Sequence, residues 1–129
     1  MSIQPAVNTP DPVVAPRHCG RIGMGEPDPA GRLVPDTVTG TALHMTLHHL
    51  QEGERLVPPL DKHGEEVAMV LDGTFQVEAA GESYLLSRGE GIIIPRREAR
   101  HWQCMSAGGQ LYRVVNLASL ADDDGAVDA

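Results

Sequence analysis

Short runs of β-branched and apolar residues, broken by Gly, Asp-Gly and Pro-containing turns, fill the chain from Thr37 to Asn116. This pattern is typical of an all-β sandwich or barrel, and no stretch in the range has sustained helical periodicity. The pattern predicts strands at Ala42 to Gln51, Arg55 to Val57, Glu66 to Leu71, Thr74 to Ala79, Ser83 to Ser87, Gly91 to Ile94, Arg100 to Met105 and Gln110 to Asn116. Asp72-Gly73, between two of these strands, predicts a hairpin turn.

Alternation along the predicted strand Glu66 to Leu71 separates two sets of side chains. Glu66, Ala68 and Val70 fall on one face, and Val67, Met69 and Leu71 fall on the other. Apart from Glu66, both faces are apolar. In so small a domain, an apolar outer face predicts that a second layer or another subunit covers it, and we expect a homodimer.

Glu66 is then a carboxylate among small apolar neighbours. Removing it from water costs several kcal/mol unless a cation or a hydrogen-bond donor meets it. The interior of the predicted barrel must therefore supply a positively charged partner, either a metal ion or a basic side chain.

The two ends of the chain have a different composition. Seven of the ten prolines precede residue 36, which excludes a long helix there and predicts an irregular N-terminal arm over residues 1–36, with a short strand around Val13 to Ile22 as a candidate. The barrel is predicted over residues 37–117. Residues 118–129 contain three consecutive aspartates and little apolar surface, so we expect a flexible acidic tail.

Composition narrows the class of protein. The chain has 129 residues, of which 41% are hydrophobic and 22% charged, as expected for one globular domain. A net charge of -8 argues against nucleic-acid binding, which requires a clustered basic face. The first twenty residues contain no continuous apolar stretch, so we expect no signal peptide, no membrane anchor and a cytoplasmic location. Cys19 and Cys104 lack metal-ligand spacing and are interpreted as ordinary thiols.

Two groups of residues lie at a spacing that identifies a family. The first group is Gly53, Pro59-Leu60-Asp61, Glu66 and Gly73; the second is Gly89, Pro95, Arg97 and Arg100 followed by His101. These positions match the two cupin motifs, which are Gly, five residues, His-x-His, three or four residues, Glu, six residues, Gly, and then Gly, five residues, Pro-x-Gly, two residues, His. The chain therefore resembles a cupin from about Thr37 to Asn116, although most of the motif histidines are replaced.

The resemblance implies a small β-barrel of the jelly-roll type, also called a double-stranded β-helix, with its site inside the barrel. It also implies frequent dimers, sometimes with an exchanged N-terminal strand that the arm could supply. Cupins include dioxygenases, decarboxylases, isomerases, lyases, polyketide-type cyclases and metabolite sensors, so the fold alone does not choose a reaction.

One hypothesis for the site is a divalent transition metal, Fe, Mn, Ni or Zn, bound by Asp61, His63, Glu66 and His101. Oxygen and imidazole ligands of this kind suit such ions. In strict register Asp61 takes the slot of the second motif histidine. His63 and His101 each need a local shift of the chain, which loops absorb at low cost.

The alternative keeps strict register and needs no metal. It places Arg100, rather than His101, beside Glu66 and Asp61 as a charge cluster. Alternation favours this arrangement, because Arg100 shares a strand face with Trp102 and Cys104. Both alternatives remain open at the level of sequence.

Further residues are candidates for ligand contacts. His44, His48 and His49 share one predicted strand, where adjacent residues point to opposite faces, so at most one of His48 and His49 enters a given site. Arg97 at the barrel mouth is a candidate for binding a substrate carboxylate, against the alternative of a solvated rim. Trp102 is a candidate apolar wall of the substrate pocket.

Two functions follow from these alternatives. The first is a metal-dependent enzyme acting on a small carboxylated or enolisable metabolite, by Lewis-acid polarisation of a substrate oxygen. The second is a metal-free barrel that binds a metabolite as a sensor, or folds one for cyclisation as polyketide-type cyclases do, with Arg100 and Glu66 as positioned catalytic charges.

Overall fold

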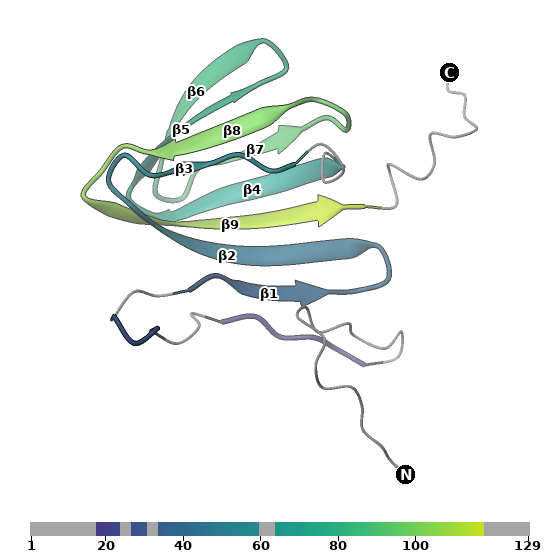
Figure 1. Ribbon diagram of the computed structural model, residues 1–129. Helices are drawn as coiled ribbons and strands as arrows, with labels where there is room; N and C mark the ends of the chain where they lie inside the picture. Colours follow the sequence, from purple (N-terminus) through teal and green to yellow (C-terminus); the bar gives the residue numbers. More distant parts are fainter. Residues whose placement is uncertain (1–17, 24–26, 31–33, 60–63, 118–129) are drawn as a thin grey trace.

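The computed structural model describes residues 18–23, 27–30, 34–59 and 64–117. These residues form an all-β barrel of two antiparallel sheets, with no helix among them (Figure 1). Consequently none of the described segments is a helix long and apolar enough to cross a bilayer. The predicted all-β class is therefore confirmed.

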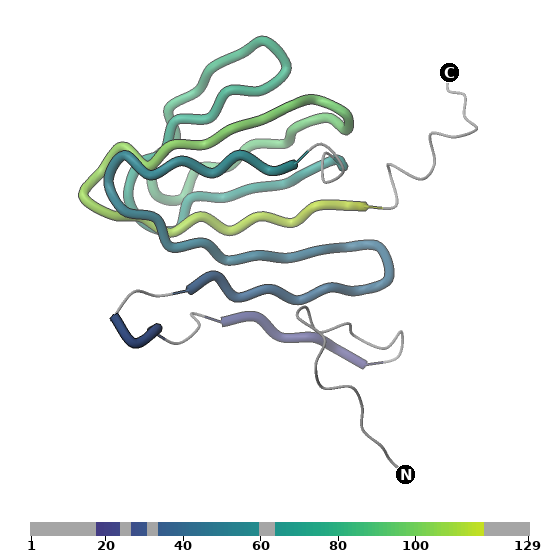
Figure 2. The backbone as a smooth tube through the Cα atoms, viewed as in Figure 1, coloured from purple at the N-terminus to yellow at the C-terminus, as the bar shows by residue number. Residues whose placement is uncertain are grey.

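The strands divide unequally between the sheets. The larger sheet has the order β1 (Asp36–Thr39), β2 (Leu43–Gln51), β9 (Gly108–Asn116), β4 (Glu65–Asp72), β7 (Gly91–Ile94). The smaller sheet has the order β3 (Arg55–Leu56), β8 (Arg100–Cys104), β5 (Thr74–Ala79), β6 (Glu82–Ser87). Figure 2 shows the chain passing repeatedly between the two sheets, so residues far apart in sequence face one another across the interior.

Each strand predicted between residues 42 and 116 is present, with ends that differ by no more than a few residues. β1 was not predicted, because it is only four residues long and follows directly on the proline-rich segment. The candidate strand at Val13 to Ile22 lies partly outside the described residues, and residues 18–22 form no strand. The predicted flexible tail, residues 118–129, lies wholly outside them.

The turn at Asp72-Gly73 is present, but the hairpin prediction is wrong. β4 pairs with β7 and β9, whereas β5 pairs with β6 and β8, so the two strands joined by this turn lie in different sheets. Gly73 has φ of 83°. A Cβ atom there would lie 2.5 Å from the carbonyl oxygen of Gly108. Glycine is therefore required at this position for a sharp passage between sheets rather than for a hairpin.

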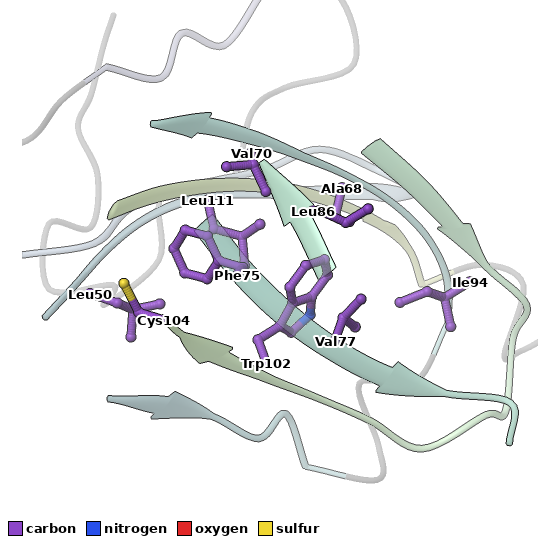
Figure 3. Packing of buried hydrophobic residues seen from close by; sticks show 10 residues of the cluster. All are labelled: Leu50, Ala68, Val70, Phe75, Val77, Leu86, Ile94, Trp102, Cys104 and Leu111. Atoms are coloured by element: carbon purple, nitrogen blue, oxygen red, sulfur yellow. The ribbon is translucent and has the colours of Figure 1, made fainter. Parts of the chain in front are cut away.

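The core lies between the sheets, and Figure 3 shows its side chains pointing toward one another. Trp102 is fully buried and packs edge-on against Phe75, with ring centroids 6.4 Å apart and an interplanar angle of 80°. This geometry is favoured by the quadrupoles of the two rings. Cys104 is buried in the same cluster as a free thiol, and Cys19 is a free thiol at the surface.

Alternation along β4 is as predicted. Glu66, Ala68 and Val70 are buried in the barrel, with exposed fractions of at most 1%, whereas Val67 and Met69 on the outer face remain exposed. The outer face of the larger sheet is thus apolar and exposed at β4 and β7, where Val67, Met69 and Ile93 lie, whereas Leu47 of β2 on the same face is buried. The homodimer stays a prediction, which this exposed face supports.

Candidate functional site inside the barrel

Glu66 is the buried carboxylate around which the site is built. It projects from β4 into the barrel with no exposed surface. Arg113 of β9 binds it in a bidentate fashion, with Nε 2.7 Å from Oε2 and Nη2 2.7 Å from Oε1. Arg100 of β8 adds a third bond, from Nη1 to Oε1 at 3.0 Å. The expected positively charged partner of Glu66 is thus a pair of arginines.

The register of the strands explains this arrangement. In the larger sheet, Glu66 lies opposite Val115, and Arg113 lies opposite Ala68. Glu66 and Arg113 are therefore diagonal neighbours on the inner face, a spacing that long side chains span easily. Arg100 belongs to the smaller sheet and reaches Glu66 from across the barrel.

Arg100 is buried, and its hydrogen bonds are complete. Its Nε donates to the carbonyl oxygen of Glu98. Its Nη1 donates to the carbonyl oxygen of Gly64 and to the carboxylate Oε1 of Glu66, and its Nη2 donates to the carbonyl oxygens of Pro95 and Glu98, all at 2.8 to 3.0 Å. A guanidinium group has five N–H donors, and all five are used. Arg100 therefore ties the turn before β8 to the start of β4, and it has no donor left for a ligand.

Arg113 differs from Arg100 in this respect. Its bonds to Glu66 and its 3.4 Å contact from Nη1 to Nε2 of His48 use three of its five donors among the described residues. The other two N–H groups make no hydrogen bond to any described residue. Sequence reasoning missed Arg113, although it stands between the inward residues Leu111 and Val115 of one strand, and a lone arginine on an apolar face was the available signal.

The charges of this cluster do not cancel. Arg100 and Arg113 bring two guanidinium charges, which stay protonated in proteins, to the single carboxylate of Glu66. His48 adds no charge near neutral pH, because burial, and then the positive charge of Arg113, lowers its pKa from 6.5 to about 3. Among the described residues, the buried cluster of Glu66, Arg100 and Arg113 therefore has one more positive than negative charge, which favours an anionic ligand.

A cavity of about 310 Å³ opens beside Arg113. Its walls come from β1, β2, β3, β9 and the segment that follows β3. The polar part of the wall consists of Thr37, His44, Thr46, His48 and Arg113, and the apolar part includes Leu56, Val57, Val115 and Leu117. The volume lies within the range of sites for small organic molecules, and the wall combines an apolar surface with a few polar groups as such sites do.

The predicted metal ligands are not brought together by the described part of the structure. Asp61 and His63 lie outside the described residues. His101 lies on the outer face of β8, where its Nε2 is 3.0 Å from Oε1 of Glu78, and both side chains are about half exposed. The alternative register is observed, because Arg100 and not His101 points inward to Glu66. Adjacent residues of a strand point to opposite faces, so both cannot enter the barrel.

The described members of that ligand set do not fit a divalent cation. Both oxygens of Glu66 already accept charge-assisted bonds from guanidinium groups. A cation at these oxygens would lie against two positive charges, which Coulomb repulsion in a buried site disfavours strongly. Among the described residues, no group of three or more His, Cys, Asp or Glu side chains could hold a metal ion.

The other predicted contact residues also lie away from the cavity wall. Trp102 belongs to the closed core, and its indole N–H is buried without a hydrogen-bond partner among the described residues. Arg97 is exposed in the turn between β7 and β8, with φ of 69°. Neither residue lines the cavity beside Arg113.

Two of the three β2 histidines face this cavity. His44 and His48 are four residues apart and line it together, whereas His49 does not. Nδ1 of His44 lies 2.9 Å from the hydroxyl oxygen of Thr39 on β1. His48 is diagonal to Arg113 across the β2–β9 pair, which places its ring against the guanidinium group.

A second, larger hollow of about 820 Å³ lies on the other side of the segment 57–59. The Glu78–His101 pair and the carboxylates of Glu82 and Glu98 line it. These side chains belong to an acidic rim. The hollow beside Arg113 differs from it, because a buried arginine with two N–H groups unpaired among the described residues lines its wall.

Comparison with models of known protein families finds no match. The chain is 32% identical over 90 residues to the polyketide synthase CurC of Streptomyces cyaneus, an alignment that covers 69% of this chain and 57% of that protein. The chain thus spans less than two thirds of the length of this relative.

Several solved structures share the fold. A cupin superfamily protein from Desulfitobacterium hafniense superposes with a TM-score of 0.58 at 10% identity, over 64% of this chain and 74% of that one. A cupin 2 conserved barrel domain protein from Leptotrichia buccalis gives 0.58 at 22% identity, over 67% and 41%. An RmlC-like cupin from Shewanella frigidimarina gives 0.56 at 19% identity, over 64% and 73%. At these identities the likeness is one of fold.

Proposed function

We propose that this chain, which has the cupin fold, binds a small and largely apolar metabolite with an anionic or enolisable oxygen in the cavity beside Arg113, and orients it for ring closure. The observation that carries the proposal is Arg113. It is almost fully buried, faces the cavity and has two N–H groups with no partner among the described residues.

The charge and shape of the cavity support this class of ligand. Arg113 and the surplus positive charge favour a carboxylate, an enolate or a phenolate oxygen, which a guanidinium group binds well. The apolar wall of Leu56, Val57, Val115 and Leu117 favours a carbon skeleton over a sugar or a phosphate ester. Poly-β-carbonyl compounds and the aromatic acids derived from them combine these two properties.

The likeness to a polyketide synthase favours cyclisation over sensing. That relative is a polyketide synthase by its name, and the aligned region covers most of this barrel. Such a barrel contributes to ring closure in two ways. A preorganised donor stabilises the oxygen of an enolate, and the walls fold a flexible chain. Glu66 and Arg100 then hold Arg113 in position rather than contact the ligand.

The predicted metal, Fe, Mn, Ni or Zn, has no step in this proposal. The reason is the chemistry of the described ligands, since Glu66 is engaged by two arginines and His101 lies outside the barrel.

Binding is tested with two probes of similar shape, salicylate and its uncharged amide, by titration calorimetry on the full chain. We expect salicylate to bind more tightly than the amide, and Arg113→Met to weaken salicylate by about 10- to 100-fold, the range for a lost bond to a charged group. Arg88→Ala, which removes an exposed arginine, is the matched control. Equal affinity of wild type and Arg113→Met would refute the proposal.

Ring closure is tested with a linear poly-β-carbonyl thioester, whose conversion to cyclic products is followed by mass spectrometry. We expect the wild-type chain to accelerate closure or to narrow the product distribution, and Arg113→Met to do neither. A product profile identical to that of the uncatalysed reaction would refute the cyclisation role, and the chain would then be a binding protein only.

A further inference from the structure

A pocket of about 320 Å³, which we call the side pocket, adjoins the cavity beside Arg113. Three residues, Pro35, His48 and Leu56, line both spaces. His48 and Leu56 are only partly buried, so they are accessible from the hollows that they border. The remaining lining residues of the side pocket are Asp28, Val34, His49, Leu50, Glu54 and Arg55. The two spaces are therefore neighbours with a common boundary.

Both spaces follow the inner face of β2. Residues on one face of a strand are two positions apart, and His44, Thr46 and His48 line the cavity, whereas His48 and Leu50 line the side pocket. A strand rises about 3.3 Å per residue, so the cavity covers about 13 Å of β2, and the side pocket continues for about 7 Å beyond His48. Together the two spaces are elongated along this strand.

The topology explains why a hollow forms beyond His48. The pairing of β1 with β2 ends at Asp36 and Leu47, so the last residues of β2 extend past β1. On the opposite side, β3 is the edge strand of the smaller sheet. The side pocket thus lies between one edge of each sheet, where no backbone pairing among the described residues closes the barrel.

An apolar surface continues from the cavity into the side pocket. Pro35 and Leu56 belong to both spaces, and Val34 and Leu50 extend the apolar wall beyond them. The ring of His48 between them is neutral at physiological pH, because burial, and then the charge of Arg113, lowers its pKa to about 3. A hydrocarbon chain that lies along this wall therefore meets no charged group at the boundary.

The charged residues of the side pocket do not select a second charged group. Oε1 of Glu54 accepts a hydrogen bond from the backbone N–H of Gln51, and Oδ1 of Asp28 accepts one from that of Ala30, so both carboxylates stabilise local turns. Arg55 brings the opposite charge to the same rim. A lining with an apolar wall and charges of both signs at its rim suits an uncharged chain.

We propose that the side pocket binds the tail of the ligand whose anionic or enolisable oxygen is bound by Arg113. The inference rests on the proposed function, because Arg113 supplies the site for the head of the ligand. It narrows the substrate class to long chains with one such head and an uncharged, largely apolar tail. A compact aromatic acid fills the cavity alone, whereas a chain of this kind uses both spaces.

The register gives the chain length at which the side pocket is reached. Arg113 lies opposite Thr46, which is two residues, or about 7 Å, from His48 and four residues, or about 13 Å, from Leu50. An extended hydrocarbon chain advances about 1.25 Å for each carbon–carbon bond of about 1.52 Å. A four-carbon acid bound at Arg113 therefore ends before His48, whereas a ten-carbon acid, about 11 Å long, passes it.

Binding of the tail is tested by titration calorimetry of the full chain with butyrate, hexanoate, octanoate and decanoate. We expect the affinity to increase about fourfold for each added methylene group up to decanoate, the factor for burying one such group. Arg113→Met should weaken every member of the series, since all share the carboxylate. An affinity that no longer increases beyond hexanoate would overturn the inference, because the chain would then end at the boundary of the cavity.

A substitution in the side pocket gives an independent test. Val34 lines the side pocket and not the cavity, and it is 40% exposed, so a polar residue there is compatible with the fold. We expect Val34→Asp to weaken decanoate about tenfold, with an effect that decreases as the chain becomes shorter. Leu85→Asp, at an exposed position outside both spaces, is the matched control. Unchanged affinity of Val34→Asp for decanoate would contradict the proposal.

Methyl NMR of the full chain locates the tail directly. Decanoate should shift the methyl signals of Val34 and Leu50 in the side pocket, and butyrate should shift those of Val115 in the cavity without moving the other two. If decanoate moved only Val115 and Leu117, the tail would lie at the opposite end of the cavity, and the inference would be wrong.

The two proposals fail in distinguishable ways. If Arg113→Met weakens neither salicylate nor any of the four alkanoates, the proposed function fails, and the tail site fails with it. If salicylate and butyrate depend on Arg113 but the affinity stops increasing at hexanoate and the Val34 signals do not move, only the inference about the side pocket is wrong.

Discussion

Arg113 and Glu66 form a bidentate ion pair in the interior of the barrel, with both N–O distances at 2.7 Å. The pair joins β9 to β4, two neighbouring strands of the larger sheet. Arg100 completes the cluster from the other sheet, but its remaining donors are used by backbone carbonyl oxygens. The two arginines therefore have different roles. Substitution of Arg100 should mainly affect stability, and substitution of Arg113 should mainly affect ligand binding.

Arg100→Ala should lower the free energy of unfolding strongly, by about 3–5 kcal/mol, the cost of removing one partner of a buried ion pair. The loss also frees the carbonyl oxygens of Gly64, Pro95 and Glu98. Urea denaturation followed by fluorescence of Trp102 measures the effect. Arg88→Ala, at an exposed position, should change stability by less than about 0.5 kcal/mol. A near-neutral result for Arg100→Ala would contradict the structural role.

Arg113→Met should cost less stability than Arg100→Ala, about 1.5–3 kcal/mol, because Arg100 still holds one oxygen of Glu66. Its main effect should be on ligand binding. Denaturation and salicylate titration on the same protein samples give both quantities. If Arg113→Met were the more destabilising variant and bound salicylate normally, the assignment of the two arginines would be reversed.

Protonation of His48 should make stability depend on pH in a defined window. Its pKa is about 3 in the folded chain and near 6.5 when unfolded, so between these values the unfolded state binds the additional proton. Stability should therefore fall as the pH drops below 6.5, by about 1.4 kcal/mol per pH unit from this residue once the pH is well below 6.5.

The contribution of His48 is obtained as the difference between wild type and His48→Gln in denaturation series from pH 7 to pH 5, above the range where most carboxylates titrate. The variant should have a shallower dependence on pH. Parallel curves for the two proteins would show that His48 titrates normally in the folded chain.

Ile93→Lys should dissociate the predicted homodimer. Ile93 lies on β7 with 65% of its surface exposed, next to the exposed Val67 of β4. Leu85→Lys is the matched control, because Leu85 is 64% exposed but lies on β6 of the other sheet. Sedimentation equilibrium should show a dimer for wild type and Leu85→Lys and a monomer for Ile93→Lys. A monomeric wild type at tens of micromolar would refute the prediction.

Divalent metals should not stabilise the folded chain through Glu66. We expect protein purified without chelating resin to contain less than stoichiometric transition metal, and added Fe(II), Mn(II), Ni(II) or Zn(II) to leave the melting temperature unchanged. An ion that binds only the folded state must raise that temperature. Stoichiometric metal that is lost in Glu66→Gln would contradict the arrangement described here and restore the metal hypothesis.

Much of the fold could be predicted from local pattern. Alternation along β4 correctly placed Glu66 inside and Val67 outside, because strand side chains alternate regardless of what the strand packs against. The local turn sequence Asp72-Gly73 led to a wrong hairpin prediction, because this turn joins strands of different sheets. Turn residues specify a local reversal of the backbone, and they carry no information about which strands then pair.

The site was predicted less well. The inward direction of Arg100 was predicted from the strand face that it shares with Trp102 and Cys104. In the structure Arg100 points inward and pairs with Glu66. Arg113 was missed, since no motif connects it with Glu66, and His48 was considered only as one of three histidines on one strand.

By itself, the amino-acid sequence determined that an acidic side chain is buried in a β-barrel and needs a cation. Only the tertiary structure decided that Arg113 and Arg100 provide it, and that Arg113 has two N–H groups without a partner among the described residues. The physical reason is that burial of a side chain follows from the periodicity of its own strand. The contacts of Glu66 with Arg100 and Arg113, which lie 34 and 47 positions away, depend instead on strand order and register. Those are set by the packing of the whole barrel.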